Sequence, residues 1–219
     1  LPDGTVRFTI YAIFKRCKSK RYSNRWNGSI KIMVFNKEVF SIFGIDPGSR
    51  NIGIAVYLID IYTLEIVKII PIQISLDKYV HTNLHNANLH IRLLRLMKEM
   101  NGLLRAYNPL AIGIESGFIN VRRPGAVIPL ASAISVISTA VNDYNSEIKL
   151  VEYTPSIIKK TIGANPHGNK NPVFEALLKI KEVDDLIDLN YLTEHTIDGI
   201  AIAYNLLKEI RTKGIQCLL

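Results

Sequence analysis

Four polar side chains with metal-binding chemistry occur in this chain at positions that a fold could bring together. Asp46 and Glu115 each end a short apolar run, and Asp46 is followed directly by a Pro-Gly pair. His195 and Asp198 are three residues apart, so they share one face if their segment is helical. A carboxylate at the end of a buried strand is costly unless it meets a cation or several hydrogen-bond donors. The repeated pattern therefore predicts a cation site.

The chemistry expected of that site is phosphodiester hydrolysis. Carboxylates that converge within a few ångströms repel one another, and Mg²⁺ with oxygen ligands relieves that repulsion. We expect two Mg²⁺ ions, with Mn²⁺ as a substitute, which would activate the attacking water and stabilise the leaving oxygen. Zinc is less suitable, because the histidines lack the spacing of a closed site. Two structural alternatives are a plain turn at Asp46 and an exposed first helical turn at Asp198.

The surrounding pattern predicts the elements that must position these side chains. Strand-like runs cover Val39–Ile45, Asn51–Leu58, Leu64–Ile74, Leu110–Ile114 and Ile148–Tyr153. Helical periodicity covers Leu84–Tyr107, Pro124–Tyr144, Ser156–Ile162, Pro172–Lys181 and Thr193–Lys213. This order predicts an α/β domain over residues 39–219, with a mixed five-stranded sheet and helices on both faces, as in the ribonuclease H-like fold. Gly199 costs a helix about 1 kcal/mol, so it predicts a close approach at that position.

The charge of the chain favours a polyanionic partner. Its 27 basic and 19 acidic residues give a net charge of +8, which suits nucleic acid first and an acidic membrane surface second. Most of this excess lies in a basic N-terminal extension over residues 1–38, which we predict to be a hairpin with a charged arm that contacts DNA. The alternative is a disordered, solubilising arm. Six of its basic residues cluster with no acidic residue among them, namely Lys15, Arg16, Lys18, Lys20, Arg21 and Arg25.

The location expected for the protein is the cytoplasm of a bacterial or phage-infected cell. No unbroken run of about 18 apolar residues occurs, so no membrane-spanning helix and no membrane partner are expected. Cys17 and Cys217, near opposite ends of the chain, are predicted to be free thiols in a reducing compartment.

Four motifs together resemble the RuvC family of Holliday junction resolvases. They are GIDPGSRNIG at 44–53, IESGF at 114–118, YTPSIIKK at 153–160 and EHTIDGIAIA at 194–203, in the family's order. The resemblance implies a dimeric, metal-dependent endonuclease that resolves four-way DNA junctions by paired symmetric nicks. It also implies that Asp46 is shared by both metals, that Glu115 and Asp198 are further ligands, and that His195 stands where the family has Asp or His.

The same resemblance implies several DNA contacts. Phe118 falls where the family places an aromatic side chain that stacks on unpaired bases, although an ordinary core residue is the alternative. Lys159 and Lys170 fall where the family has phosphate-contacting lysines, although lone lysines commonly lie on a solvated face. Further basic candidates for DNA binding are Lys160, Arg122 and Arg123. The Arg122-Arg123 pair departs from the family pattern, as does the basic extension, and both would favour branched DNA more generally.

The homodimer has support in the small side chains of the helix that follows Glu115, since such a helix can pack closely against a second copy. Close packing onto the protein's own sheet is the alternative.

Three other functions remain open at the level of the sequence. The first is a nuclease for other branched DNA, such as flaps or forks. The second is a non-catalytic module that binds branched DNA. The third is an ATPase or a sugar-kinase-like protein, which shares the sheet and an Asp-x-Gly turn but normally needs a duplicated domain and more than 219 residues.

Overall fold

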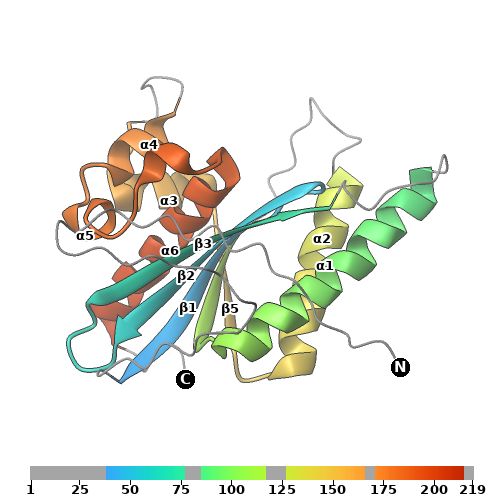
Figure 1. The fold of residues 1–219 in the computed structure, drawn as a ribbon, viewed down its shortest axis with the longest axis horizontal. Helices are drawn as coiled ribbons and strands as arrows, with labels where there is room; N and C mark the ends of the chain where they lie inside the picture. Colours follow the sequence, from blue (N-terminus) through green and yellow to red (C-terminus); the bar gives the residue numbers. More distant parts are fainter. Residues whose placement is uncertain (1–37, 77–84, 117–126, 166–170, 215–219) are drawn as a thin grey trace, which may run out of the picture.

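The computed structural model describes residues 38–76, 85–116, 127–165 and 171–214. A five-stranded sheet lies between two groups of helices (Figure 1). Its strands are β1 (Val39–Asp46), β2 (Asn51–Asp60), β3 (Ile66–Ser75), β4 (Ala111–Glu115) and β5 (Lys149–Tyr153). The helices are α1 (His85–Tyr107), α2 (Val127–Tyr144), α3 (Pro155–Ile162), α4 (Pro172–Leu177), α5 (Lys181–Asp184), the 3-10 turn η3 (Leu189–Tyr191) and α6 (Glu194–Lys213).

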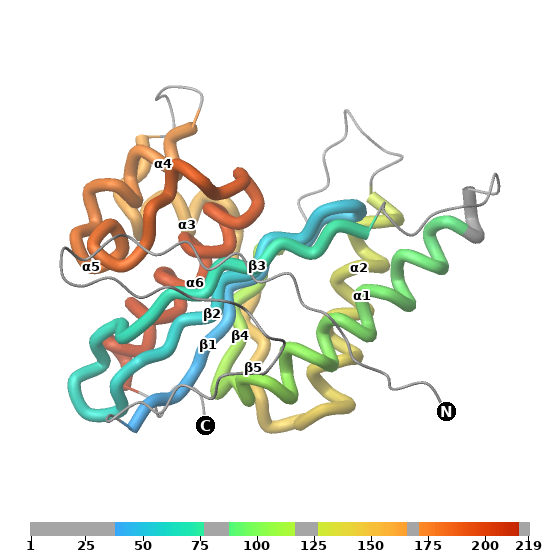
Figure 2. Tube along the Cα trace, in the orientation of Figure 1, coloured from blue at the N-terminus to red at the C-terminus, as the bar shows by residue number. Residues whose placement is uncertain are grey.

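The strand order is β3-β2-β1-β4-β5, which places β1 at the centre of the sheet (Figure 2). The first three strands form an antiparallel meander, and β4 and β5 then add parallel to β1. Because β1 and β4 are parallel neighbours, their carboxyl ends lie at the same edge of the sheet. The register pairs Ile45 of β1 with Ile114 of β4, so Asp46 and Glu115 follow two adjacent positions.

Helices cover both faces of the sheet, and each face has its own apolar core. On one face, α1 and α2 pack through residues such as Leu96, Met100 and Ile137. On the other face, the core includes α6 with α3 and α4, through residues such as Ile200 and Leu206. Because the sheet is buried on both faces, its strands consist mainly of apolar residues. The predicted ribonuclease H-like architecture is confirmed.

Two predicted elements differ in their bounds for local reasons. The third strand begins at Ile66, because Leu64 has φ of 56° within the turn after β2. The helix expected over Pro172–Lys181 is two short helices, α4 and α5, since Ile180 is extended between them. The predicted N-terminal hairpin and both cysteines lie outside the described residues.

Helix α2 is, among the described residues, the one helix long and apolar enough by length and composition to cross a membrane. Serine and threonine side chains interrupt its sequence, so it is not an unbroken apolar run. Its Ala133, Ile137, Ala140 and Val141 are buried in the core beside α1. The helix is therefore part of the packed fold.

Candidate active site

Asp46 is the last residue of the central strand and reaches past the apolar core. The residues before it, from Ile42 to Ile45, are buried, whereas the Asp46 side chain keeps 14% exposure. Its Oδ2 atom lies 2.6 Å from Nδ1 of His195, 149 residues later in the chain. The strand thus delivers a carboxylate to the edge of the sheet, and α6 delivers an imidazole to meet it.

Glu115 ends the adjacent strand β4. Its backbone pairs with Tyr153 of β5, and the amide of Ser116 donates to the carbonyl of Tyr153 at 2.8 Å. These contacts hold the end of β4 in line with the sheet. The Glu115 carboxyl therefore leaves the sheet at the same edge as Asp46.

Helix α6 begins at Glu194, so His195 and Asp198 both lie near its N-terminal end. The Thr193 side chain caps the helix by accepting from the amide of Thr196, which satisfies a free donor of the first turn. His195 and Asp198 consequently lie in the first two turns. Further along, the buried hydroxyl of Tyr57 on β2 donates to the carbonyl of Ile200 at 3.0 Å and helps to hold the helix on the sheet.

Three glycines let α6 approach the sheet backbone to backbone. A Cβ atom on Gly53 of β2 would lie 1.8 Å from the His195 carbonyl oxygen, and one on Gly44 of β1 would lie 2.2 Å from that of Gly199. A Cβ atom on Gly199 would meet backbone atoms of both strands at 3.2 Å. The close approach predicted at Gly199 is therefore to the protein's own sheet, and it sets how far His195 and Asp198 stand from Asp46.

The acidic side chains of the site interact electrostatically. Burial and, as a smaller effect, the charge of Asp46 raise the pKa of Glu115 to about 7, while Lys159 opposes the shift. Burial also raises the pKa of Asp198 to about 7, with added repulsion from Asp46, Glu115 and Glu194. The hydrogen bond to Asp46 raises the pKa of His195. Glu115 and Asp198, whose ionisation is disfavoured beside the negative charge of Asp46, complete with it a donor set suited to a hard cation.

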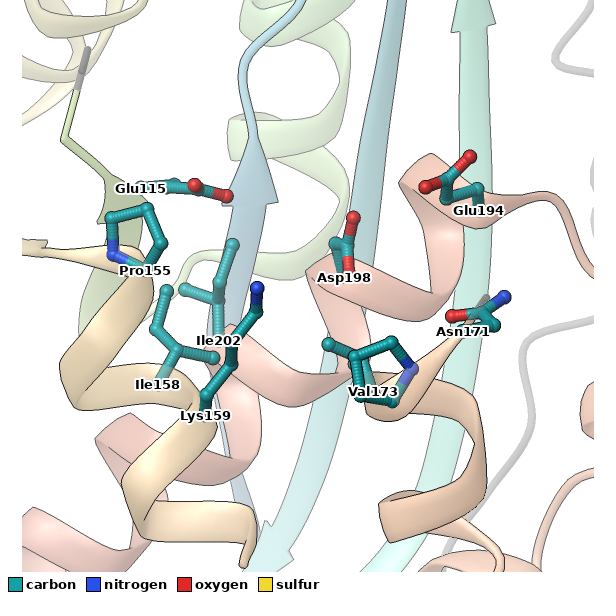
Figure 3. A pocket seen from close by; sticks show the side chains of 10 residues that line it. Glu115, Pro155, Ile158, Lys159, Asn171, Val173, Glu194, Asp198 and Ile202 are labelled. Carbon is teal, nitrogen blue, oxygen red and sulfur yellow. The ribbon is translucent and has the colours of Figure 1, made fainter. Parts of the chain in front are cut away.

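A cavity of about 250 Å³ opens beside these carboxyls (Figure 3). Glu115 lines one side, Asp198 and Glu194 line the other, and Lys159 of α3 extends between them in this view. Its floor is apolar and includes Ile158, Val173 and Ile202. Lys160 is exposed and is not among the residues that line the cavity.

Glu194 and Asn171 were missed as site residues by the sequence analysis. Glu194 lies four residues before Asp198, so helical spacing alone would have found it. Asn171 caps α4 by accepting from the amide of Phe174, a role that its place before Pro172 suggests. Only the tertiary packing of α4 brings it to the cavity.

The arrangement is not a closed metal centre. Within the four described ranges, no group of three or more His, Cys, Asp and Glu side chains is arranged to hold a metal ion. One oxygen of Asp46 is instead engaged by His195. The four side chains assigned to the site from the sequence thus gather at one edge of the sheet, with Asp46 and His195 in direct contact.

The remaining predicted contacts with DNA lie outside the described residues. They are Phe118, Arg122, Arg123, Lys170, Lys15, Arg16, Lys18, Lys20, Arg21 and Arg25. Lys159 is thus the one predicted phosphate contact that the described structure places in the wall of the cavity.

Comparison with known proteins gives a consistent result. Residues 42–205 match the family model described as "Crossover junction endodeoxyribonuclease RuvC". A protein of that name from Hydrogenovibrio crunogenus is 31% identical over 144 residues, covering 64% of this chain and 76% of its own length. Its counterpart from Chlamydia pneumoniae is 27% identical over 163 residues, covering 74% and 89%.

Solved structures with the same fold include two resolvases. Thermus thermophilus RuvC in complex with Holliday junction substrate has a TM-score of 0.62 at 17% identity, covering 80% of this chain and 97% of that one. The yeast mitochondrial Holliday junction resolvase has a TM-score of 0.52 at 13% identity, covering 83% and 87%. At these identities the likeness establishes the fold.

Proposed function

Because this chain belongs to the RuvC family of crossover junction endodeoxyribonucleases, we propose that Asp46, Glu115, His195 and Asp198 form its hydrolytic site and that four-way DNA junctions are its substrate. The observation that carries the assignment is the gathering of these side chains from β1, β4 and α6 at one edge of the sheet. They are separated by up to 152 positions in the chain, so their association is a property of the fold.

The metal that fits this donor set is Mg²⁺, with Mn²⁺ as a substitute and two ions in each site. The family is metal-dependent, and carboxylate oxygens are the ligands that Mg²⁺ favours. Asp46, Glu115 and Asp198 would hold the ions, with His195 beside them. Glu115 and Asp198, whose pKa values are raised to about 7, would have to lose their protons for an ion to bind. Mg²⁺ would supply a polarised water and would stabilise the departing oxygen.

The chain's own residues supply binding and orientation. Lys159, which extends into the cavity between Glu115 and Asp198, would neutralise a phosphate of the strand to be cut. His195 orients the carboxylate of Asp46 through their 2.6 Å contact. The apolar floor of the cavity limits the access of water from below.

Two nicks related by twofold symmetry need two sites, so a homodimer is part of the proposal. Helix α2 supports it, because Ile128, Ala131, Ser135 and Thr139 are exposed along one face, and Ile128 is 71% exposed. Sedimentation of the purified chain would show a mass near 49 kDa for a dimer, twice the 24.7 kDa of one chain. A monomer that still makes paired nicks would contradict this part.

The proposed function is tested by incubating a synthetic four-way junction, a flap, a fork and a plain duplex with the protein and Mg²⁺, and mapping the products. We expect symmetric nicks in the four-way junction. Asp46→Asn should abolish cutting while the variant still binds the junction. Asp185→Asn is the matched control, because it removes the same charge from an exposed position directly after α5.

Each alternative has its own outcome in that panel. Cutting of flaps or forks in preference to the four-way junction would move the substrate to another branched DNA. Binding without cutting of any branch would favour a non-catalytic module. Normal cutting by Asp46→Asn would overturn the site assignment itself.

A further inference from the structure

At Asp46, the end of β1 pairs with β2 on one side but not with β4 on the other. Its backbone pairs with Gly53 of β2, whereas the described pairing of β1 with β4 ends one residue earlier, at Ile45 and Ile114. The position of the Asp46 backbone therefore depends on β2 and on the connection from β1 to β2. That connection consists of residues 47–50.

The connection is tightly folded. A Cβ atom on Gly48 would lie 1.9 Å from the carbonyl oxygen of Asn51, so the backbone folds back tightly on itself there. Pro47 is buried, and the carbonyl of Arg50 accepts from the amide of Leu76 at 2.8 Å, just after β3. One end of the connection is thus fixed to the meander.

The connection is also held by α1, which lies on the opposite face of the sheet from α6. Arg92 donates from its Nη1 to the carbonyl of Ser49 at 3.1 Å, and from its Nε to the carbonyl of Asn88 at 3.3 Å. The second bond ties the guanidinium to its own helix, so the first is made by a side chain with a defined orientation. Arg92 is half-buried, and its planar group bonds two carbonyls in fixed directions.

We propose that Arg92 is a positioning residue for hydrolysis: it fixes the connection after β1 through Ser49 and thereby sets where the Asp46 carboxylate stands. This inference rests on the proposed function, since it assumes that Asp46 acts in cutting. A displacement of about 1 Å at a reacting group reduces rates by up to roughly 100-fold, so the effect on turnover should be large.

The test compares four proteins on the four-way junction with Mg²⁺. Arg92→Met keeps the length of the side chain but has no donor, and Arg92→Lys keeps the charge and one donor. Arg105→Met is the matched control, since it removes the same charge from an exposed position in the last turn of the same helix. Turnover, the Mg²⁺ concentration for half-maximal cutting, junction affinity in Ca²⁺ and the melting temperature are measured for each.

We expect Arg92→Met to lower turnover roughly 10- to 100-fold and to raise the Mg²⁺ requirement, with junction affinity within about twofold of wild type. Arg92→Lys should recover most of the turnover, and Arg105→Met should match wild type. If Arg92→Met does not stay folded, Arg92→Gln, which retains a donor without the charge, takes its place. In that case turnover near wild type supports the hydrogen bond, and turnover no better than background overturns it.

Several results would overturn the proposal while leaving the function in place. One is normal turnover in Arg92→Met. Another is weaker junction binding with a smaller salt dependence, which would make Arg92 a phosphate contact instead. Failure of the proposed function is seen separately, because the wild-type protein would then leave the junction uncut.

Discussion

Oδ2 of Asp46 and Nδ1 of His195 lie 2.6 Å apart, which joins the end of the central strand to the first turn of the last helix. The contact uses a carboxylate that also repels Glu115 and Asp198. His195 therefore has two effects at once: it orients Asp46, and its positive form offsets part of the negative charge of the site.

Two substitutions of His195 test its part in the reaction. His195→Ala should lower turnover roughly 10- to 100-fold, as is usual when a partner of a metal-binding carboxylate is lost. His195→Asp should retain more activity than His195→Ala, since an acid can serve as a ligand at that position. Single-turnover cutting of the junction at several Mg²⁺ concentrations measures both. Wild-type activity in His195→Ala would show that the imidazole has no part in the reaction.

The raised pKa of Asp198 predicts a pH-dependent stability. Its pKa is about 7 in the folded protein against an ordinary value of 3.8, so the folded state holds a proton that the unfolded state has lost between these values. The stabilising contribution of this group is therefore complete below about pH 4 and is lost as pH rises toward 7. At pH 8 without metal, Asp198→Asn should be more stable than wild type by about 1–2 kcal/mol after solvent screening.

Thermal unfolding in EDTA at pH 8 and at pH 5 measures this difference. The melting temperature of Asp198→Asn should exceed that of wild type by a few degrees at pH 8, and the gap should narrow at pH 5. Added Mg²⁺ should raise the melting temperature of wild type more than that of the variant, because ligand binding stabilises the folded state. A variant that is less stable than wild type at pH 8 would contradict the repulsion.

The glycine contacts under α6 predict a loss of activity that exceeds the loss of stability. In Gly199→Ala, the new methyl would meet backbone of β1 and β2 at 3.2 Å, so α6 must move by a few tenths of an ångström. Overpacking costs about 1–3 kcal/mol, but alanine returns about 1 kcal/mol as a better helix former. Turnover should fall at least tenfold, because the shift displaces His195 and Asp198.

Gly113→Ala is the control for that experiment. Its methyl would meet side-chain atoms of Ile202 and Tyr153 at 3.1 Å, and side chains yield more readily than backbone. Gly53→Ala represents the opposite extreme. Its new methyl would lie 1.8 Å from the carbonyl oxygen of His195, a contact that cannot be accommodated, so the variant should not fold. Unchanged turnover in Gly199→Ala would show that catalysis tolerates a small shift of α6 relative to the sheet.

The basic N-terminal extension predicts a change in salt dependence. Deleting residues 1–38 should flatten the slope of log affinity against log salt by about 0.9 for each phosphate contact that is lost. Fluorescence anisotropy of a labelled junction between low and moderate salt provides the measurement. An unchanged slope would assign the extension to another task, such as solubility.

The fold could be predicted to a large extent because its signals are local. Apolar runs of strand length, the Thr193 cap and the acids at the ends of β1 and β4 are all visible in consecutive residues. The Asp46–His195 contact could not be predicted, because it depends on how deeply α6 packs. That depth is set by Gly44 and Gly53, which are ordinary strand glycines in the sequence.

The same reasoning explains Asn171 and Arg92. Asn171 stands just before a predicted helix and Arg92 lies within one, and the role of each follows only from tertiary packing. Gly199 is the intermediate case: its unfavourable place in a helix predicted a close neighbour, and the structure identifies that neighbour as the sheet.

The parallel pairing of β1 with β4, in which Ile42 lies beside Ala111, has a consequence for how the protein is made. Pairing across such sequence separations forms slowly, and the helix that bears His195 and Asp198 is synthesised after all five strands. A chain still being translated therefore holds the strand-end acids without their helical partners. Under the site assignment proposed above, newly made protein acquires the ability to cut DNA only after α6 has emerged from the ribosome.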